Sequence, residues 1–165
     1  MSLLSRVAFG SRETIAGTVY GTIVVMGAIA AGSGKDARAG ELAAVVTGTV
    51  LVLWIAHVYS HALAETVRIG RRMDRAELTS VARRELAIPL AAVAPVTWLV
   101  LGSLGVLRDS TAGWLAMGFG LATLLLQGIR YAGVERLSPL GTAVTVGINL
   151  GLGIVIVALK AGLGH

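Results

Sequence analysis

The stretch LAAVVTGTVLVLWIAHVYSHALAETV, residues 42–67, is long and apolar enough to cross a lipid bilayer, yet it carries three ionisable side chains in its second half. A transmembrane helix needs about 20 predominantly apolar residues. His57, His61 and Glu65 follow one another at intervals of four residues, so on a helix they form a column on one side. A charged group facing lipid costs at least about 2.5–3.5 kcal/mol, so the column is predicted to face the interior of a helix bundle.

The composition of the whole chain is typical of a membrane protein. Of its 165 residues, 55% are hydrophobic and 14% are charged, whereas about a quarter of the residues in a soluble domain are charged. The chain has no cysteine, which excludes disulfides, iron–sulfur clusters, thiolate zinc sites and cysteine nucleophiles. The net charge of +5 would suit nucleic acid in a soluble protein, but the arginines lie between apolar segments. Membrane topology therefore explains the charge, and no nucleic-acid partner is expected.

Five segments are apolar and long enough to cross a membrane, namely 13–32, 42–67, 86–107, 112–134 and 139–163. The sequence thus predicts an all-α, polytopic membrane protein with five transmembrane helices, in which a single membrane domain occupies residues 1–165. Pro95 is expected to kink the third helix. Residues 68–85 space apolar side chains at near-helical intervals among charges. They are interpreted as a short amphipathic cytoplasmic helix or as a solvated basic loop attracted to anionic membrane lipids.

The positions of the basic residues predict the orientation of the chain. Arginine is much commoner than lysine, and together with abundant alanine, glycine and valine this indicates a bacterial protein. One side of the predicted membrane carries the arginines at positions 6, 12, 68, 71, 72, 75, 83, 84, 130 and 136. The other side carries Lys35, Arg38, Arg108 and Lys160, partly balanced by acidic residues. The positive-inside rule then places the N-terminus in the cytoplasm and the C-terminus outside, in a bacterial inner membrane.

Strongly polar side chains of other predicted spans lie at depths similar to that of the histidine column. Tyr20 belongs to the first span, Gln127 and Arg130 to the fourth, and Asn149 to the fifth. At about 1.5 Å per residue, most of them fall in the cytoplasmic half, while the outer halves are mostly Leu, Val, Ala and Gly. This pattern predicts a polar cavity that opens to the cytoplasm and is closed on the outside by an apolar plug. Taken alone, Gln127 or Asn149 is better explained by hydrogen bonding between helices.

The residue types in the column are typical of cation sites. Imidazole and carboxylate bind Fe(II), Mn(II), Zn(II) or Co(II), and histidines at i and i+4 can both reach one ion. The same groups could relay protons, because histidine titrates near neutral pH. Glu65 has a simpler alternative, an ion pair with Arg68 or Arg130 near the membrane interface. The candidate metal ligands are His57, His61 and Glu65, and the supporting polar groups are Tyr20, Gln127, Arg130 and Asn149.

Two G-x-x-x-G pairs indicate close helix packing. Gly17 and Gly21 lie in the first predicted span, and Gly147 and Gly151 lie in the fifth. We expect these faces to bring the first and fifth spans together, within one subunit or across a dimer.

The layout of the chain resembles that of the vacuolar iron transporter family. The segment GTVYG (17–21) is similar to the G-x-N-D-G-type segment of that family, with Tyr20 in place of the aspartate. The segment SHALAE (60–65) is similar to its S-M-A-A-G-E-like run, with His61 at the methionine and Glu65 at the glutamate. The loop between the second and third spans is shorter than the glutamate-rich helices of the family. The resemblance implies a dimer that exports a divalent metal from the cytosol by proton exchange.

These observations predict a membrane transport protein or channel that handles a cation, a divalent metal or protons, through a cytoplasm-facing polar cavity. Bound lipid and a homo-oligomer, preferably a dimer, are the expected partners. An enzyme is not expected, because the sequence shows neither a nucleotide-binding motif nor a convincing serine–histidine pattern. The alternative is a membrane scaffold or accessory subunit that transports nothing, in which the polar faces hold helices together. A further alternative is a small channel with its pore at an oligomer axis.

Overall fold

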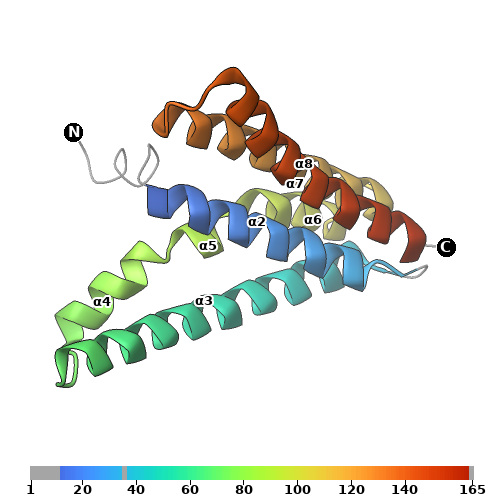
Figure 1. Ribbon diagram of the computed structural model, residues 1–165. Helices are drawn as coiled ribbons and strands as arrows, with labels where there is room; N and C mark the ends of the chain where they lie inside the picture. Colours follow the sequence, from blue (N-terminus) through green and yellow to red (C-terminus); the bar gives the residue numbers. More distant parts are fainter. Residues whose placement is uncertain (1–11, 35–36, 164–165) are drawn as a thin grey trace.

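The chain folds into a bundle of helices, shown in Figure 1. The computed structural model describes residues 12–34 and 37–163, and all regular structure in these ranges is helical. The helices are α2 (Arg12–Gly32), α3 (Ala39–Ile69), α4 (Arg75–Arg84), α5 (Ala87–Leu90), α6 (Val93–Ser103), α7 (Asp109–Val134) and α8 (Pro139–Leu163). The predicted all-α class is confirmed.

Among the described residues, four helices are long and apolar enough to cross a membrane. These segments are Thr14–Gly32, Ala39–Ile69, Asp109–Val134 and Pro139–Gly162. A fifth candidate is a pair of helical segments, Arg75–Leu90 and Val93–Ser103, which pass the same test together but are bent by 49°. The five apolar segments of the sequence therefore fall on α2, α3, the α5–α6 pair, α7 and α8, with ends that differ by a few residues.

The third apolar segment is broken upstream of the proline that was expected to kink it. Helix α5 ends at Leu90 and α6 begins at Val93, so Pro95 is the third residue of α6. A proline this close to the start of a helix costs no intrahelical hydrogen bond, because the first N–H groups of a helix have no partner within it. In a continuous helix its ring would clash with the carbonyl four residues earlier, that of Ala91, and Ala91 lies in the break between α5 and α6.

Two glycines of α2 allow α5 to approach closely. A Cβ placed on Gly21 would lie 2.6 Å from the carbonyl oxygen of Ile88, and one placed on Gly17 would lie 3.0 Å from the Cβ of Ala87. Any side chain at Gly21 would therefore push the backbone of α5 away. The first span thus uses its G-x-x-x-G face against the third apolar segment.

Within the subunit, the prediction that these glycines pack against those of the fifth span is wrong, and packing across a dimer stays a prediction. No side-chain or neighbouring-helix atom lies within 4 Å of a Cβ placed on Gly147 or Gly151. Helix α8 instead uses Gly153, where an added Cβ would lie 2.6 Å from Leu121 of α7. Helix α8 contacts both α7 and α2, but its G-x-x-x-G pair lies on the side that faces away from them.

The apolar core fills only one end of the bundle. It draws on the C-terminal half of α2, the N-terminal half of α3, Ile88 of α5, α6 and α7. Every buried residue of α3 lies between Ala39 and Val50. Beyond Val50 the helix diverges from α2, α7 and α8, and α4 and α5 lie beside it (Figure 1). The largest fully buried side chains include Met26, Ile29, Leu99, Met117 and Leu124.

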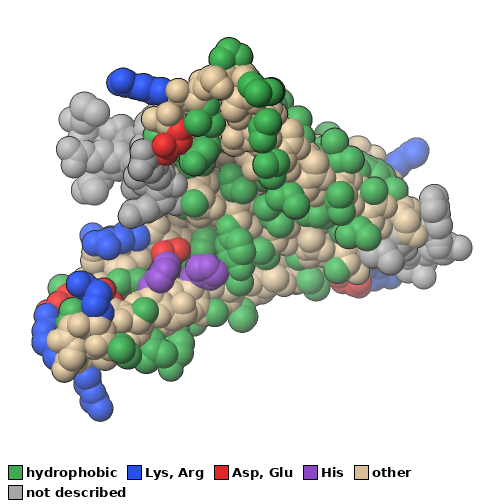
Figure 2. Space-filling model, viewed as in Figure 1, with side chains coloured by type: hydrophobic (Ala, Val, Ile, Leu, Met, Phe, Trp, Pro, Cys, Tyr) green, Lys and Arg blue, Asp and Glu red, His purple; other side chains and the backbone are tan. Residues whose placement is uncertain are grey.

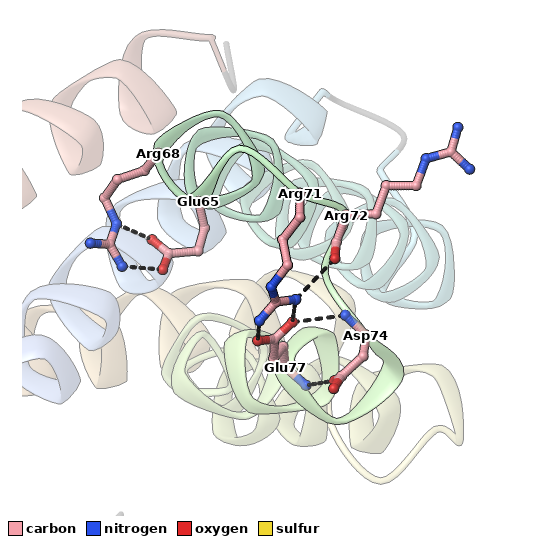
Figure 3. Close-up of polar contacts among 6 residues, drawn as sticks. All are labelled: Glu65, Arg68, Arg71, Arg72, Asp74 and Glu77. Carbon is pink, nitrogen blue, oxygen red and sulfur yellow. Dashed lines mark hydrogen bonds and ion pairs between the residues drawn. The ribbon is translucent and has the colours of Figure 1, made fainter.

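Helix α4 forms where the sequence left helix and basic loop as alternatives. Gly70 ends α3 with a left-handed φ of 67°, and Asp74 begins α4 with a capping box in which its side chain accepts a hydrogen bond from the N–H of Glu77. The Glu77 carboxylate also binds Arg71, with Nη2–Oε1 and Nη1–Oε2 distances of 2.6 and 3.0 Å (Figure 3). Glu77 thereby raises the pKa of Arg71 above its usual value, mainly through this hydrogen bond.

The far end of α4 is attached to α3 by polar contacts, one of which is a hydrogen bond from a tryptophan of α3. The Trp54 indole Nε1 donates to the Ala82 carbonyl at 3.3 Å. No residue of α4 is buried. The hairpin of α3 and α4 is thus fixed at its turn and at the C-terminal end of α4. It carries the arginines of residues 68–84 at one end of the molecule (Figure 2).

A candidate binding pocket between α2, α3 and α4

A pocket of about 920 Å³ lies where the second half of α3 diverges from α2. Helix α2 contributes Tyr20 and small residues, and α3 contributes the column of His57, His61 and Glu65. The third wall consists of α4 and the start of α5, including Arg84 and Glu85. Figure 2 shows the two histidines side by side at the surface of this hollow. The apolar core lies between the pocket and the opposite end of the bundle.

The predicted histidine column faces this pocket and joins an aromatic residue of the first span. The ring centroids of Tyr20 and His57 are 5.0 Å apart, and those of His57 and His61 are 6.2 Å apart in an edge-on arrangement. The Nδ1 of His57 lies 3.3 Å from the carbonyl oxygen of Leu53, one turn earlier. Tyr20, His57 and His61 therefore form a continuous row across α2 and α3.

His61 pairs with a carboxylate that the sequence did not indicate. Its Nδ1 lies 2.8 Å from Oε1 of Glu85, the C-terminal capping residue of α4. The Glu85 side chain is 18% exposed and that of His61 is 56% exposed, so the pair lies partly sheltered at the pocket wall. Glu85 is 24 residues from His61, and no sequence periodicity links two different helices. Only the docking of α4 against α3 reveals the contact.

Glu65 takes the simpler of the two predicted roles. Both of its carboxylate oxygens bind the guanidinium of Arg68 on the next turn of α3, and the Nε–Oε2 distance is 2.9 Å (Figure 3). Its side chain still lines the pocket. The carboxylate is therefore occupied by Arg68 and not directed at the histidines.

Within residues 12–34 and 37–163, no three histidine, aspartate or glutamate side chains are grouped closely enough to hold a metal ion. His61 is paired with Glu85 and Glu65 with Arg68. Metal binding by His57, His61 and Glu65 would thus require Glu65 to leave Arg68. A divalent ion at these residues stays a prediction.

Of the supporting polar residues, Tyr20 lines the pocket, whereas Gln127, Arg130 and Asn149 lie outside its lining, on α7 and α8. Gln127 is 6% exposed, and its Oε1 is buried without a hydrogen-bond partner in the described part of the chain. Asn149 Nδ2 donates to the carbonyl oxygen of Leu124 at 3.3 Å and so links α8 to α7. This contact is the hydrogen bond between helices that the sequence offered as its simpler explanation.

Comparison with known proteins gives no assignment. No family model, curated protein or solved structure matches the chain. The resemblance to the vacuolar iron transporter family therefore stays a prediction.

Proposed function

We propose that the chain is a membrane transport protein that takes up a cation, in the first place a proton, in the pocket between α2, α3 and α4. The observation that carries this proposal is the His61–Glu85 pair at 2.8 Å in the wall of a pocket that also holds His57 and Tyr20. An imidazole hydrogen-bonded to a carboxylate can bind and release a proton near neutral pH. It needs no further ligands to do so, unlike a metal ion.

The apolar surface of the bundle supports the membrane location. Helix α3 has 31 residues and is about 46 Å long, more than the roughly 30 Å of a bilayer core. Its outer face carries Val52, Ile55, Tyr59, Leu63 and Val67, each more than half exposed. Apolar side chains in such a row are expected to contact lipid.

The distribution of arginine supports an orientation in which the pocket opens to the cytoplasm. The turn between α3 and α4 carries Arg71 and Arg72, and the pocket lies at this end of the bundle. Under the positive-inside rule this end is cytoplasmic and the membrane is a bacterial inner membrane. The apolar core would then block the route to the outside, so transport would require the helices to move.

Proton flux into liposomes tests the proposal directly. The wild-type protein should dissipate an imposed pH gradient, measured with a trapped pH-sensitive dye, and His61→Gln and Glu85→Gln should abolish the flux. Ser60→Ala is the matched control, because Ser60 is an exposed neighbour of His61 that does not line the pocket. A wild-type protein without flux would contradict proton transport, and flux that survives His61→Gln would contradict the His61–Glu85 pair as its site.

The metal alternative is tested on the same preparations. Mn(II), Co(II) and Zn(II) are titrated at pH 7.5 and pH 5.5, and elemental analysis of the purified protein accompanies the titrations. Binding to histidine should weaken at the lower pH, because a ligand imidazole must be deprotonated. It should be lost in His61→Ala and weakened in Glu65→Gln. Binding without proton flux would replace the proton by a metal ion as the cargo.

The rival proposal is a scaffold or accessory subunit, and one observation favours it. The three glutamates that line the pocket each bind another side chain of the same chain: Glu65 binds Arg68, Glu77 binds Arg71 and Glu85 binds His61. The last two pairs can hold α4 to α3 and to the turn between them without transporting anything. Absence of both proton flux and metal binding would favour this role. A homodimer, which the family resemblance implies, stays a prediction for either function.

A further inference from the structure

The pocket is much larger than a proton or a metal ion requires. Pockets for small organic molecules have volumes of about 300–1,000 Å³, and this pocket, which is open on one side, has a volume of about 920 Å³. Part of its wall is apolar, contributed by Ala16, Ala64, Met73, Val81 and Ile88. A space of this size and lining fits an organic molecule with an apolar body.

The polar groups that remain available in the pocket are mostly hydrogen-bond donors. The carboxylates of Glu65, Glu77 and Glu85 are occupied by Arg68, Arg71 and His61. In contrast, the guanidinium of Arg84 has no hydrogen bond or ion pair to any described residue. A guanidinium has five N–H donors and no acceptor, and it binds carboxylate or phosphate in a bidentate manner.

Two hydroxyl groups extend this set of donors. Ser80 lies one turn before Arg84 on the same face of α4, and Tyr20 faces the pocket from α2. Neither side chain forms a hydrogen bond within the described ranges. Arg68 binds both oxygens of the Glu65 carboxylate, and Arg84 acts on that carboxylate only as a nearby charge. The N–H donors of Arg84 are therefore left for a ligand.

We infer that the pocket binds a small organic anion, a carboxylate with an apolar body, whose charged end is held by Arg84. The apolar body lies against Val81, Ile88 and the Tyr20–His57 row. This inference rests on the proposed function only in taking the same pocket as the working site. It does not depend on proton movement itself.

Equilibrium binding to the purified full-length chain in detergent tests the inference. Benzoate, benzyl alcohol and benzylamine are titrated by calorimetry, because they share a ring and differ in charge. Benzoate should bind, and the alcohol and the amine should bind at least tenfold more weakly. Octanoate, titrated in parallel, distinguishes an acyl chain from a ring as the apolar body.

The variants separate Arg84 from general surface charge. Arg84→Gln should raise the Kd of benzoate about 10- to 100-fold, the loss expected for one charge-assisted hydrogen bond. Arg83→Gln, which removes the same charge one residue earlier at an exposed position outside the pocket, should leave the Kd within twofold. Tyr20→Phe, a second variant that removes only a hydroxyl, should give a smaller loss.

Three results would overturn the inference. The first is that neither benzoate nor octanoate binds at millimolar concentration. The second is that benzylamine binds as tightly as benzoate. The third is that Arg84→Gln and Arg83→Gln weaken benzoate binding equally. Each is independent of the liposome assay. Proton flux without anion binding would refute the inference and leave the proposed function in place. Anion binding without proton flux would support the inference and refute proton transport.

Discussion

Lys160 Nζ donates a hydrogen bond to Ser33 Oγ at 2.6 Å and so joins the end of α8 to the end of α2. The Lys160 side chain is only 8% exposed, and its ammonium lies 5.3 Å from the ring centroid of Trp114 in α7. Ser33 in turn donates to the Ile29 carbonyl at 2.6 Å. The cation therefore lies over the C-terminal turn of α2, where the helix dipole favours positive charge. The three helices are fixed together at the end of the bundle opposite the pocket.

Removal of the Ser33 hydroxyl should destabilise the protein. Ser33→Ala leaves a buried ammonium without its hydroxyl acceptor, which costs about 1.5–3 kcal/mol for a hydrogen bond to a charged group. The apparent melting temperature in detergent should fall by several degrees. Ser103→Ala is the matched control. The Ser103 hydroxyl, like that of Ser33, donates to a carbonyl of the preceding helical turn, but Ser103 is exposed. Equal shifts in the two variants would show that the contact with Lys160 contributes nothing.

The glycines of α2 and α8 should respond in opposite ways to alanine. Gly21→Ala places a methyl group 2.6 Å from the Ile88 carbonyl oxygen, and overpacking of this kind costs about 1–3 kcal/mol. Gly147→Ala adds a methyl group with no atom within 4 Å, and alanine gains up to about 1 kcal/mol in helix propensity. Thermal unfolding in detergent should therefore occur earlier in the first variant and at the same temperature or later in the second. If Gly21→Ala is as stable as the wild type, α2 and α5 do not pack as described.

The capping box of α4 should control the pocket through the position of that helix. Asp74→Ala removes the side chain that accepts from the Glu77 N–H, and loss of such a cap costs about 1 kcal/mol. Amide exchange in residues 75–80 should become faster, and benzoate should bind more weakly because Ser80 and Arg84 are carried on α4. Asp74→Asn is the control, since asparagine caps helices about as well as aspartate. Unchanged exchange in Asp74→Ala would mean that α4 is held by its contacts with Trp54, His61 and Arg71 and not by its cap.

The helices could be predicted from the sequence because their signals are local. The length of each apolar segment and the intervals of four between His57, His61 and Glu65 depend on a single helix. The same is true of the Glu65–Arg68 pair, which the sequence offered as an alternative. These features are set by neighbours a few residues away along the chain.

The partners of each helix face could not be predicted in the same way. A G-x-x-x-G pair shows that a face is small, but not whether it meets α5, as at Gly21, or nothing, as at Gly147. Glu85 reaches His61 only because α4 folds back along α3, and the break before Pro95 determines where α5 meets α2. The arrangement of the helices in space depends on the packing of all of them together. For this reason the sequence predicted one polar cavity shared by four spans, whereas the structure has a pocket formed by α2, α3, α4 and α5.

Single cysteines should establish the orientation on which the proposed function depends. The chain has no cysteine, so each introduced thiol reports one position. Val106→Cys lies in the turn between α6 and α7, where Val106 is 65% exposed, and Arg72→Cys lies in the turn between α3 and α4. On intact cells a membrane-impermeant maleimide should label residue 106, and residue 72 should react only after permeabilisation, because arginine-rich turns stay in the cytoplasm. The reverse pattern would place the pocket on the outside. Labelling of both residues from the same side would show that the bent α5–α6 segment enters the membrane and returns without crossing it.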